Sequence, residues 1–208
     1  MDFENDDVRI CRMTSMGEYK VVKLMMNEEP TGNKAEMLKA CNSNPWLFAD
    51  VHISSNTKRT DDIVKRFTSV LKPGDPVICL GDLCDKHTSN IELVTSFVNR
   101  INTGNMYLIL GNNDYYTISD YIKMGFKYVT DEFSFKKDGK DIVMTHAPIP
   151  TRSKRINIHG HIHGSGVYWN MNPAGHYDVF VGTDECPDIV RMDTLLNTNK
   201  VNTYRKVT

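Results

Sequence analysis

The sequence predicts an α/β domain in which helices pack against a mixed β-sheet. From Pro45 onward, short apolar runs alternate with segments whose apolar side chains recur at helical spacing. The second half of the chain is richer in strand-like runs, and Asp138-Gly139 between two of them is a hairpin signal. Strand–helix alternation followed by a strand-rich half is typical of a layered α/β domain.

The predicted strands are short, mostly apolar runs, and the first of them, 46–49, is of the kind that is buried on both faces of a sheet. They lie at 46–49, 77–80, 107–110, 133–135, 142–144, 156–158 and 179–181. Helices are predicted at about 60–71, 89–102 and 118–124. In the first of them, Thr60 and Asp61 can cap the helix, and the apolar residues from Ile63 to Leu71 lie on one face. Pro73 and Gly74 then end it.

Residues 1–44 differ from the rest and carry no chemical motif. Val8–Met13 and Tyr19–Met26 are expected to form two strands with Gly17 in the turn between them, and Lys34–Cys41 a short helix. We therefore predict an N-terminal extension over 1–44 and one α/β domain over 45–208.

Length and charge bound what the protein can do. The 208 residues suit one domain with a substantial core, and 40% hydrophobic residues is ordinary for a globular protein. The formal net charge of −1 gives no global attraction to nucleic acid or to an anionic membrane. The basic segment 151–155 is either a local anion-binding patch or a solvated loop.

Cysteine usage and the N-terminus favour a cytoplasmic protein. Five cysteines are an odd number and show no CxxC spacing, which fits reduced thiols rather than a disulfide framework. The acidic N-terminus lacks the basic and apolar regions of a signal peptide. No run approaches the roughly 20 apolar residues that a membrane helix needs, so we expect no membrane association.

Metal-ligand residue types follow the apolar runs in series. The segments are Asp50-Val51-His52, Gly81 to Asp85, Gly111 to Asp114, Thr145-His146 and Gly160 to His163. One such segment is most simply a polar loop start, but a whole series suggests that strands deliver Asp, Asn and His to a common edge. On a continuing strand, residues two apart point to the same side, so Asp50 with His52, and His161 with His163, could each chelate a metal. Imidazole with carboxylate suits zinc, manganese or iron, whereas calcium or magnesium favours an all-oxygen site.

The order of these motifs resembles the calcineurin-like metallophosphoesterase superfamily, over about residues 45 to 185. The family pattern is D-x-H, G-D-x-x-D, G-N-H-[DE], a lone His and G-H-x-H. Thr145 to Pro148 and Val181 to Asp184 are similar to segments of the compact bacterial and phage members. The resemblance implies two packed mixed β-sheets flanked by helices, the four-layer sandwich of that family.

The resemblance also implies a role for each matching residue. Asp50, His52 and His163 would hold one divalent ion, and Asn112, His146 and His161 the other. Asp82 would bridge the two ions, and a metal-bridging hydroxide would attack the phosphorus. Manganese is the expected ion, with zinc, iron or nickel as alternatives.

One position departs from the family pattern, because Asn113 stands where a histidine is usual. That histidine is thought to protonate the leaving group, supported by the residue that corresponds to Asp85. An amide cannot act as an acid, and losing general acid catalysis costs roughly 10²–10⁴-fold in rate. Three explanations are open. The substrate has a good leaving group or the metals alone suffice for catalysis; His87 replaces the missing histidine as the acid; or the protein binds metals but catalyses poorly. The residues expected to take part in catalysis are Asp82, Asn112, Asp85, Asn113 and His87.

Four further residues near the last motif have open roles. His159 alternates with His161 and His163 and is a structural histidine, a residue that supports the ligands, or a substrate contact. His176 lies in a loop that could approach the rim of the site. Tyr168 and Trp169 could stack on a base or sugar, or pack in the core.

The leading hypothesis is a binuclear phosphoesterase for a phosphodiester or small nucleotide. A phosphomonoesterase or protein phosphatase is an alternative, although Lys86 replaces the Arg that those phosphatases commonly have. A metal-bearing scaffold with little catalysis is the non-enzymatic alternative. The expected partner is a small phosphorylated substrate; nucleic acid is not favoured, and the sequence does not define an oligomeric state.

Overall fold

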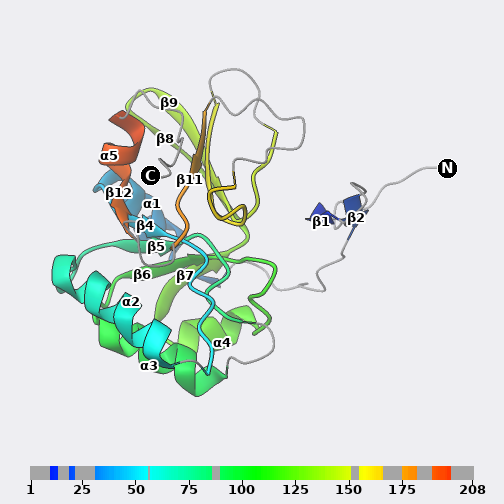
Figure 1. Ribbon diagram of the computed structural model, residues 1–208. Coiled ribbons are helices and arrows are strands. Elements are labelled where there is room, and N and C mark those ends of the chain that lie inside the picture. Colours follow the sequence, from blue (N-terminus) through cyan, green and yellow to red (C-terminus); the bar gives the residue numbers. More distant parts are fainter. Residues whose placement is uncertain are drawn as a thin grey trace, which may run out of the picture.

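The computed structural model describes residues 10–13, 19–21, 31–55, 57–85, 90–150, 155–165, 175–181 and 189–197 (Figure 1). Its largest sheet has six strands in the order β12-β4-β5-β6-β7-β3. The central strands β4 (Trp46–Phe48), β5 (Val77–Cys79), β6 (Met106–Ile109) and β7 (Phe126–Thr130) run parallel. The edge strands β3 (Thr31–Gly32) and β12 (Val190–Arg191) are antiparallel to their neighbours. The sheet is therefore mixed.

The second sheet has four strands in the order β11-β10-β9-β8. Strands β9 (Lys140–Thr145), β10 (Arg155–His159) and β11 (His176–Asp178) run parallel. Strand β8 (Glu132–Lys137) forms an antiparallel hairpin with β9. The turn places Asp138 and Gly139 at φ values of 50° and 74°, as the Asp-Gly signal predicts. The prediction of two mixed sheets is confirmed.

Three helices cover one face of the six-stranded sheet (Figure 1). They are α2 (Thr57–Val70), α3 (Ile91–Ile101) and α4 (Ile118–Lys123), and their apolar faces form an outer core with Phe48, Cys79 and Leu108. The side chain of Asn90 caps the start of α3, and Asn102 ends that helix in the left-handed conformation. None of the helices in the described part of the chain is long and apolar enough to cross a membrane.

An inner core lies between the two sheets. Alternate residues of the central strands, such as Leu47, Ile78 and Tyr107, meet Phe133 and Met144 from the second sheet. Two helices complete this core, α1 (Lys34–Asn42) and α5 (Met192–Asn197). With helices on the outer face and beside the inner core, the predicted layered α/β architecture is confirmed.

The N-terminal region divides into two parts. Strands β1 (Ile10–Met13) and β2 (Tyr19–Val21) form the expected hairpin as a sheet of their own. The segment just before residue 45, in contrast, belongs to the main body. Strand β3 pairs with β7, and Met37, Ala40 and Cys41 of α1 are buried in the inner core. The packing therefore extends the domain back to about residue 31, because an amphipathic helix must bury its apolar face.

Two local predictions differ from the structure, and one central strand was not predicted. Helix α2 begins at Thr57, before the predicted cap at Thr60. The last predicted strand, 179–181, is wrong: β11 lies at His176–Asp178, and Phe180 makes only an isolated bridge to Ala49. Strand β7 was not predicted. Its sequence alternates Phe, Lys and Tyr next to a glycine and lacks the fully apolar pattern of its neighbours.

We expect Phe67→Ala to destabilise the fold by about 3–5 kcal/mol, because it empties a large space in a close-packed core. The Phe67 ring is fully buried and packs edge-on against Phe48 and Phe97, with ring centroids 4.9 and 6.2 Å away. Urea unfolding followed by circular dichroism measures the change. Val70→Ala on the same helix is the matched control, since Val70 is 42% exposed and should change stability by no more than about 0.5 kcal/mol. Equal stability of the two variants would show that α2 does not pack as described.

Candidate metal centre

The predicted ligand residues lie at the carboxyl ends of strands from both sheets. Asp50 and His52 follow β4, Asp82 follows β5, and Asn112 follows β6. His146 directly follows β9, while His161 and His163 follow β10. Backbone hydrogen bonds join these segments, from the Asp50 N–H to the Gly81 carbonyl and from the Gly160 N–H to the His146 carbonyl. The two sheets thus deliver their ligands to one shared edge.

The backbone turns sharply at these residues and does not continue as strand. Among the described residues, eight non-glycine residues have a clearly positive φ, and five of them are predicted ligands. These five are Asp50 (61°), His52 (49°), Asp82 (51°), His161 (72°) and His163 (49°). The expectation that Asp50 with His52, and His161 with His163, alternate along continuing strands is therefore wrong. Left-handed turns aim the side chains, at a cost of about 1–3 kcal/mol each, and such conformations cluster at functional sites.

Two glycines allow the backbone segments to approach one another closely. A Cβ atom at Gly111 would overlap the backbone nitrogen and the Oδ1 atom of Asp82. A Cβ atom at Gly160 would overlap the Ala49 side chain and the carboxylate of Asp50. Only glycine fits at these two positions, since any side chain would displace a carboxylate from the site.

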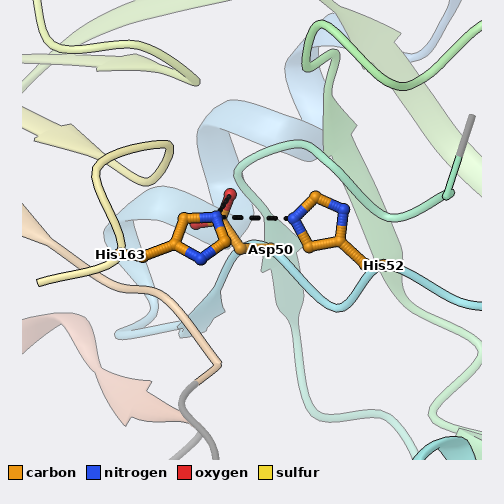
Figure 2. Close-up of side chains that lie close together, drawn as sticks. All are labelled: Asp50, His52 and His163. Atoms are coloured by element: carbon orange, nitrogen blue, oxygen red, sulfur yellow. Dashed lines mark hydrogen bonds and ion pairs between the residues drawn. The ribbon is translucent and has the colours of Figure 1, made fainter.

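The first ligand group consists of Asp50, His52 and His163 (Figure 2). The Nε2 atom of His163 lies 3.3 Å from Oδ1 of Asp50 and 3.4 Å from Nε2 of His52. Asp50 is fully buried, whereas the side chain of His163 is 50% exposed. The group is therefore buried in the protein at Asp50 and exposed to solvent at His163.

The second ligand group consists of Asp82, His146 and His161. The Nε2 atom of His146 lies 3.3 Å from Oδ1 of Asp82, 3.1 Å from Nδ1 of His161 and 3.1 Å from Oδ1 of Asn112. The other ring nitrogen of His146, Nδ1, lies 2.9 Å from the Leu80 carbonyl, which can only accept a hydrogen bond. The neutral ring is thus protonated at Nδ1, which leaves the Nε2 lone pair facing the group, as in a metal-ligating histidine.

Asp82 connects the two groups. Its Oδ1 atom faces His146 of the second group, and its Oδ2 atom lies 3.8 Å from Nε2 of His52 in the first. Asn113 holds the carboxylate from a third side: its backbone N–H donates to Oδ1 at 2.9 Å and its side-chain amide to Oδ2 at 2.7 Å. One carboxylate thereby offers an oxygen to each group.

The electrostatics of the site favour the ionised form of Asp82 and the neutral form of two of its imidazoles, His161 and His52. Burial opposes ionisation of Asp82, but the hydrogen bond and charge of His146 outweigh it and hold the pKa of Asp82 below its ordinary value. Burial also opposes protonation of His146, yet Asp82 raises the pKa of that ring to about 9. Burial and the neighbouring His146 lower the pKa of His161 to about 4, and burial lowers the pKa of His52. His163 has a raised pKa because its ring hydrogen-bonds to Asp50.

The donor set fits two divalent ions. Metal–ligand bonds of about 2.0–2.2 Å place neighbouring ligand atoms about 3.0–3.5 Å apart, and the separations of 3.1–3.4 Å in the structure lie in this range. The Nε2 atom of His146 faces two oxygens and one ring nitrogen at 3.1–3.3 Å and can donate at most one hydrogen, so a shared cation explains this convergence better. Nitrogen mixed with carboxylate oxygen suits manganese, zinc or iron. The seven residues Asp50, His52, Asp82, Asn112, His146, His161 and His163 could hold these ions.

The other predicted site residues have different placements. The backbone N–H of Asp85 donates to the Ile53 carbonyl, beside the His52 segment. His159 and His176 are buried in the second sheet. His87, Tyr168, Trp169 and the basic residues at 151–154 lie outside the described residues.

Two residues that support the site were given no role by the sequence. The buried carboxylate of Asp114 accepts hydrogen bonds from the Cys84 N–H at 3.1 Å and the Gly111 N–H at 2.8 Å, so it ties the second and third motifs together. Burial raises its pKa to about 6. The Arg59 guanidinium donates to the Val51 carbonyl between two ligands. The sequence did contain a signal for Asp114, because a carboxylate stands at the last position of the third motif. No sequence signal pointed to Arg59.

Comparison with known proteins gives one family. The model of that family, described as calcineurin-like phosphoesterase, matches residues 45–187. No curated protein matches the chain significantly.

Solved structures with a similar fold include a protein of unknown function, AQ665, from Aquifex aeolicus. It is 18% identical, and the match covers 66% of this chain and 90% of that one, with a TM-score of 0.49. An archaeal phosphodiesterase is 15% identical over 73% of this chain and 95% of that one, with a TM-score of 0.46. Pseudomonas putida nuclease MPE is 22% identical over 56% and 60%, with a TM-score of 0.42. Likeness at this level does not define an activity.

Divalent metal affinity should rise with pH between pH 6 and 8. Below its raised pKa of about 9, His146 carries a second proton on the nitrogen that would bind the ion, so binding must release that proton. We expect the affinity to increase by up to about tenfold per pH unit in this range. Calorimetric titration with manganese, in buffers of different ionisation enthalpy, measures both the affinity and the protons released. Affinity that is constant with pH, without proton release, would contradict this account.

Proposed function

The chain belongs to the calcineurin-like phosphoesterase family and is a hydrolase that acts on phosphoric esters, and we propose that it uses two divalent ions to hydrolyse a phosphodiester or a small nucleotide. One observation carries this proposal: the carboxylate of Asp82 presents one oxygen to each ligand group. Two groups that share a carboxylate are suited to two ions a few ångströms apart, the spacing of two-metal phosphoester hydrolysis. Asp50, His52 and His163 would hold one ion, and Asn112, His146 and His161 the other.

When bound, two divalent ions would make a water molecule acidic enough to attack phosphorus at neutral pH and would neutralise charge on the phosphoryl group. The protein residues hold the ligand side chains in position. Asn113 fixes Asp82 through two hydrogen bonds, and the Leu80 carbonyl sets the tautomer of His146. Asp50 accepts the backbone N–H of His161 at 2.9 Å, which joins the first ligand group to the loop of the second. Such fixed polar groups need little reorganisation during the reaction.

The substrate is expected to enter from the side of His163 and Asn112. Asn112 is exposed and His163 half-exposed, whereas Asp50 and Asp82 form the buried floor. A phosphoryl group placed above this floor meets the ligand groups, and the rest of the substrate extends into solvent. This arrangement favours a small, accessible phosphoester.

The residue at position 113 favours a diester or another substrate with a good leaving group. Asn113 can donate hydrogen bonds but cannot give up a proton as an acid. Its side-chain amide is also directed to Asp82 at 2.7 Å, so it is engaged with the carboxylate. A leaving group of low pKa needs no proton at the moment of bond cleavage. His87 stays a candidate for a substitute acid, and Asp85 for its support.

Manganese is the ion we propose, with zinc, iron or nickel as alternatives, because the ligands combine imidazole with carboxylate. We also propose a cytoplasmic location, supported by the described cysteines Cys41, Cys79 and Cys84, which are free and buried. The proposed partner is a small phosphorylated substrate; a nucleic acid is less favoured because the net charge is only −1.

A phosphomonoesterase or protein phosphatase is the second candidate. The observation in its favour is the open side of the first ligand group, which would admit a phosphorylated side chain. Comparing turnover of a phosphopeptide with that of a diester separates these two enzymes. A metal-bearing scaffold is the non-enzymatic candidate and predicts bound ions without any hydrolysis.

Bis-p-nitrophenyl phosphate should be hydrolysed in the presence of manganese and not after chelation. Asp82→Asn should lower kcat by at least about 10²-fold, because an amide bridges two cations poorly and the charge at the centre is lost. Nitrophenolate release measures the rate, and elemental analysis counts bound ions. Glu132→Gln on an exposed strand position is the matched charge control and should leave the rate unchanged. The proposal fails if no divalent ion supports turnover and Asp82→Asn equals the wild type.

Hydrolysis should depend steeply on the acidity of the leaving group. In a series of aryl diesters, kcat is expected to fall as the pKa of the phenol rises, since Asn113 gives no proton to the departing oxygen. Asn113→His should make this dependence shallower by accelerating the poor leaving groups. The slope of log kcat against leaving-group pKa is the measurement. Identical slopes for the wild type and Asn113→His would show that position 113 has no part in proton transfer.

A further inference from the structure

A buried polar cluster lies on the second sheet, behind the loop that carries two predicted ligands. We define this cluster by His159 of β10 with His176 and Asp178 of β11, which are 0%, 1% and 1% exposed. Ile158 packs in the inner core and Tyr177 packs partly against it, so the alternating residues of the cluster point to the opposite face of the sheet. Burying such groups is costly unless they make specific hydrogen bonds. These three buried residues are therefore expected to have a structural or functional role.

Two members of the cluster hold the two ends of the ligand loop. The Nδ1 atom of His159 lies 2.9 Å from the Gly160 carbonyl, so the ring must donate from this nitrogen. The Oδ2 atom of Asp178 accepts the backbone N–H of Gly164 at 2.7 Å. Residues His161 and His163 lie between these two anchor points. His159 and Asp178 are register partners on adjacent strands, so one rigid sheet carries both anchors.

The loop between the anchors needs external support. His161, His163 and Gly164 all have positive φ values of 72°, 49° and 67°. Left-handed non-glycine residues such as His161 and His163 persist only where their surroundings enforce them. The side chain of His163 is half-exposed, so core packing does not fix it. The hydrogen bonds at Gly160 and Gly164 constrain the two ends of this loop, in addition to the bond from the His161 N–H to Asp50.

The third member of the cluster holds the first in place. The ring of His176 packs edge-on against the ring of His159, with centroids 5.6 Å apart and an interplanar angle of 61°. His176 is itself 1% exposed, so it restricts the rotation of the His159 ring. The donor nitrogen of His159 is thereby kept on the Gly160 carbonyl.

We infer that His159 and Asp178 are positioning residues for the metal ligands His161 and His163. They touch neither ion nor substrate and act by fixing the backbone of the ligand loop. This inference rests on the proposed metal centre, but it concerns ion binding and is independent of which ester is hydrolysed. Residues that orient ligands in this way typically change metal affinity about 10–100-fold when replaced.

Two pairs of variants test the inference. Asp178→Leu and His159→Leu remove the hydrogen bonds, and we expect each to weaken manganese affinity by about 10–100-fold in the intact protein. Asp178→Asn keeps an acceptor oxygen, and His159→Asn keeps a donor near the Nδ1 position, so both should retain affinity close to that of the wild type. Retention by Asp178→Asn also separates the hydrogen bond from the charge of Asp178. Calorimetric titration with manganese gives the affinities, and urea unfolding of each metal-free variant gives its stability.

A purely structural role would give a different result. Phe67→Ala lowers stability far from the cluster, so it serves as the control in which a destabilised but folded protein binds manganese normally. The inference is overturned if the two leucine variants bind manganese like the wild type, or lose affinity only as much as Phe67→Ala does. It is also overturned if the wild type binds no manganese. If the leucine variants lose affinity while no ester is hydrolysed, the inference holds and the proposed function fails.

Discussion

Two buried carboxylates at the junction of the sheets set the conditions for the rest of the structure. Asp50 and Asp82 are almost fully shielded from solvent, and the ion pairs that the structure shows for them are with histidines. A buried carboxylate is stable only where charge or hydrogen bonds compensate for lost water. Histidine suits this place because its neutral ring can also bind a metal ion. The same side chains thus stabilise the metal-free fold and can hold the ions.

This constraint explains the unusual backbone at the sheet edge. For several side chains to converge on two carboxylates, the chain must leave each strand in a sharp turn, and five of the ligand residues adopt left-handed conformations to do so. The cost is met by hydrogen bonds from outside the ligand set. Asp114 ties two of the loops, Arg59 holds the Val51 carbonyl, and Asp178 holds Gly164. The site is consequently a property of both sheets together.

The sequence predicted the parts of this arrangement that depend on local pattern. Apolar runs identified most strands, and the polar residues after those runs are the side chains that the structure brings together in both groups, because parallel strands end at one edge. What failed depends on contacts far apart in sequence. The turns at Asp50 and His161 are imposed by packing between segments, and no local pattern distinguishes them from continuing strand. Likewise Asp178 follows an unremarkable tyrosine, and its role arises only because β11 lies beside β10. Helix α1 was set apart from the domain for the same reason, since its partner strand β7 comes much later in the chain.

The amide of Asn113 fixes the position of Asp82 but cannot act as a proton donor in catalysis. A histidine there would gain or lose a proton near neutral pH, and its hydrogen bond to Asp82 would vary with that state. Asn113 does not titrate, so its contacts of 2.9 and 2.7 Å with Asp82 are available at any pH. The carboxylate that joins both ligand groups is therefore held more constantly, while proton donation from position 113 is given up. For the proposed phosphoesterase, this means that leaving groups that depart without a proton would be cleaved fastest.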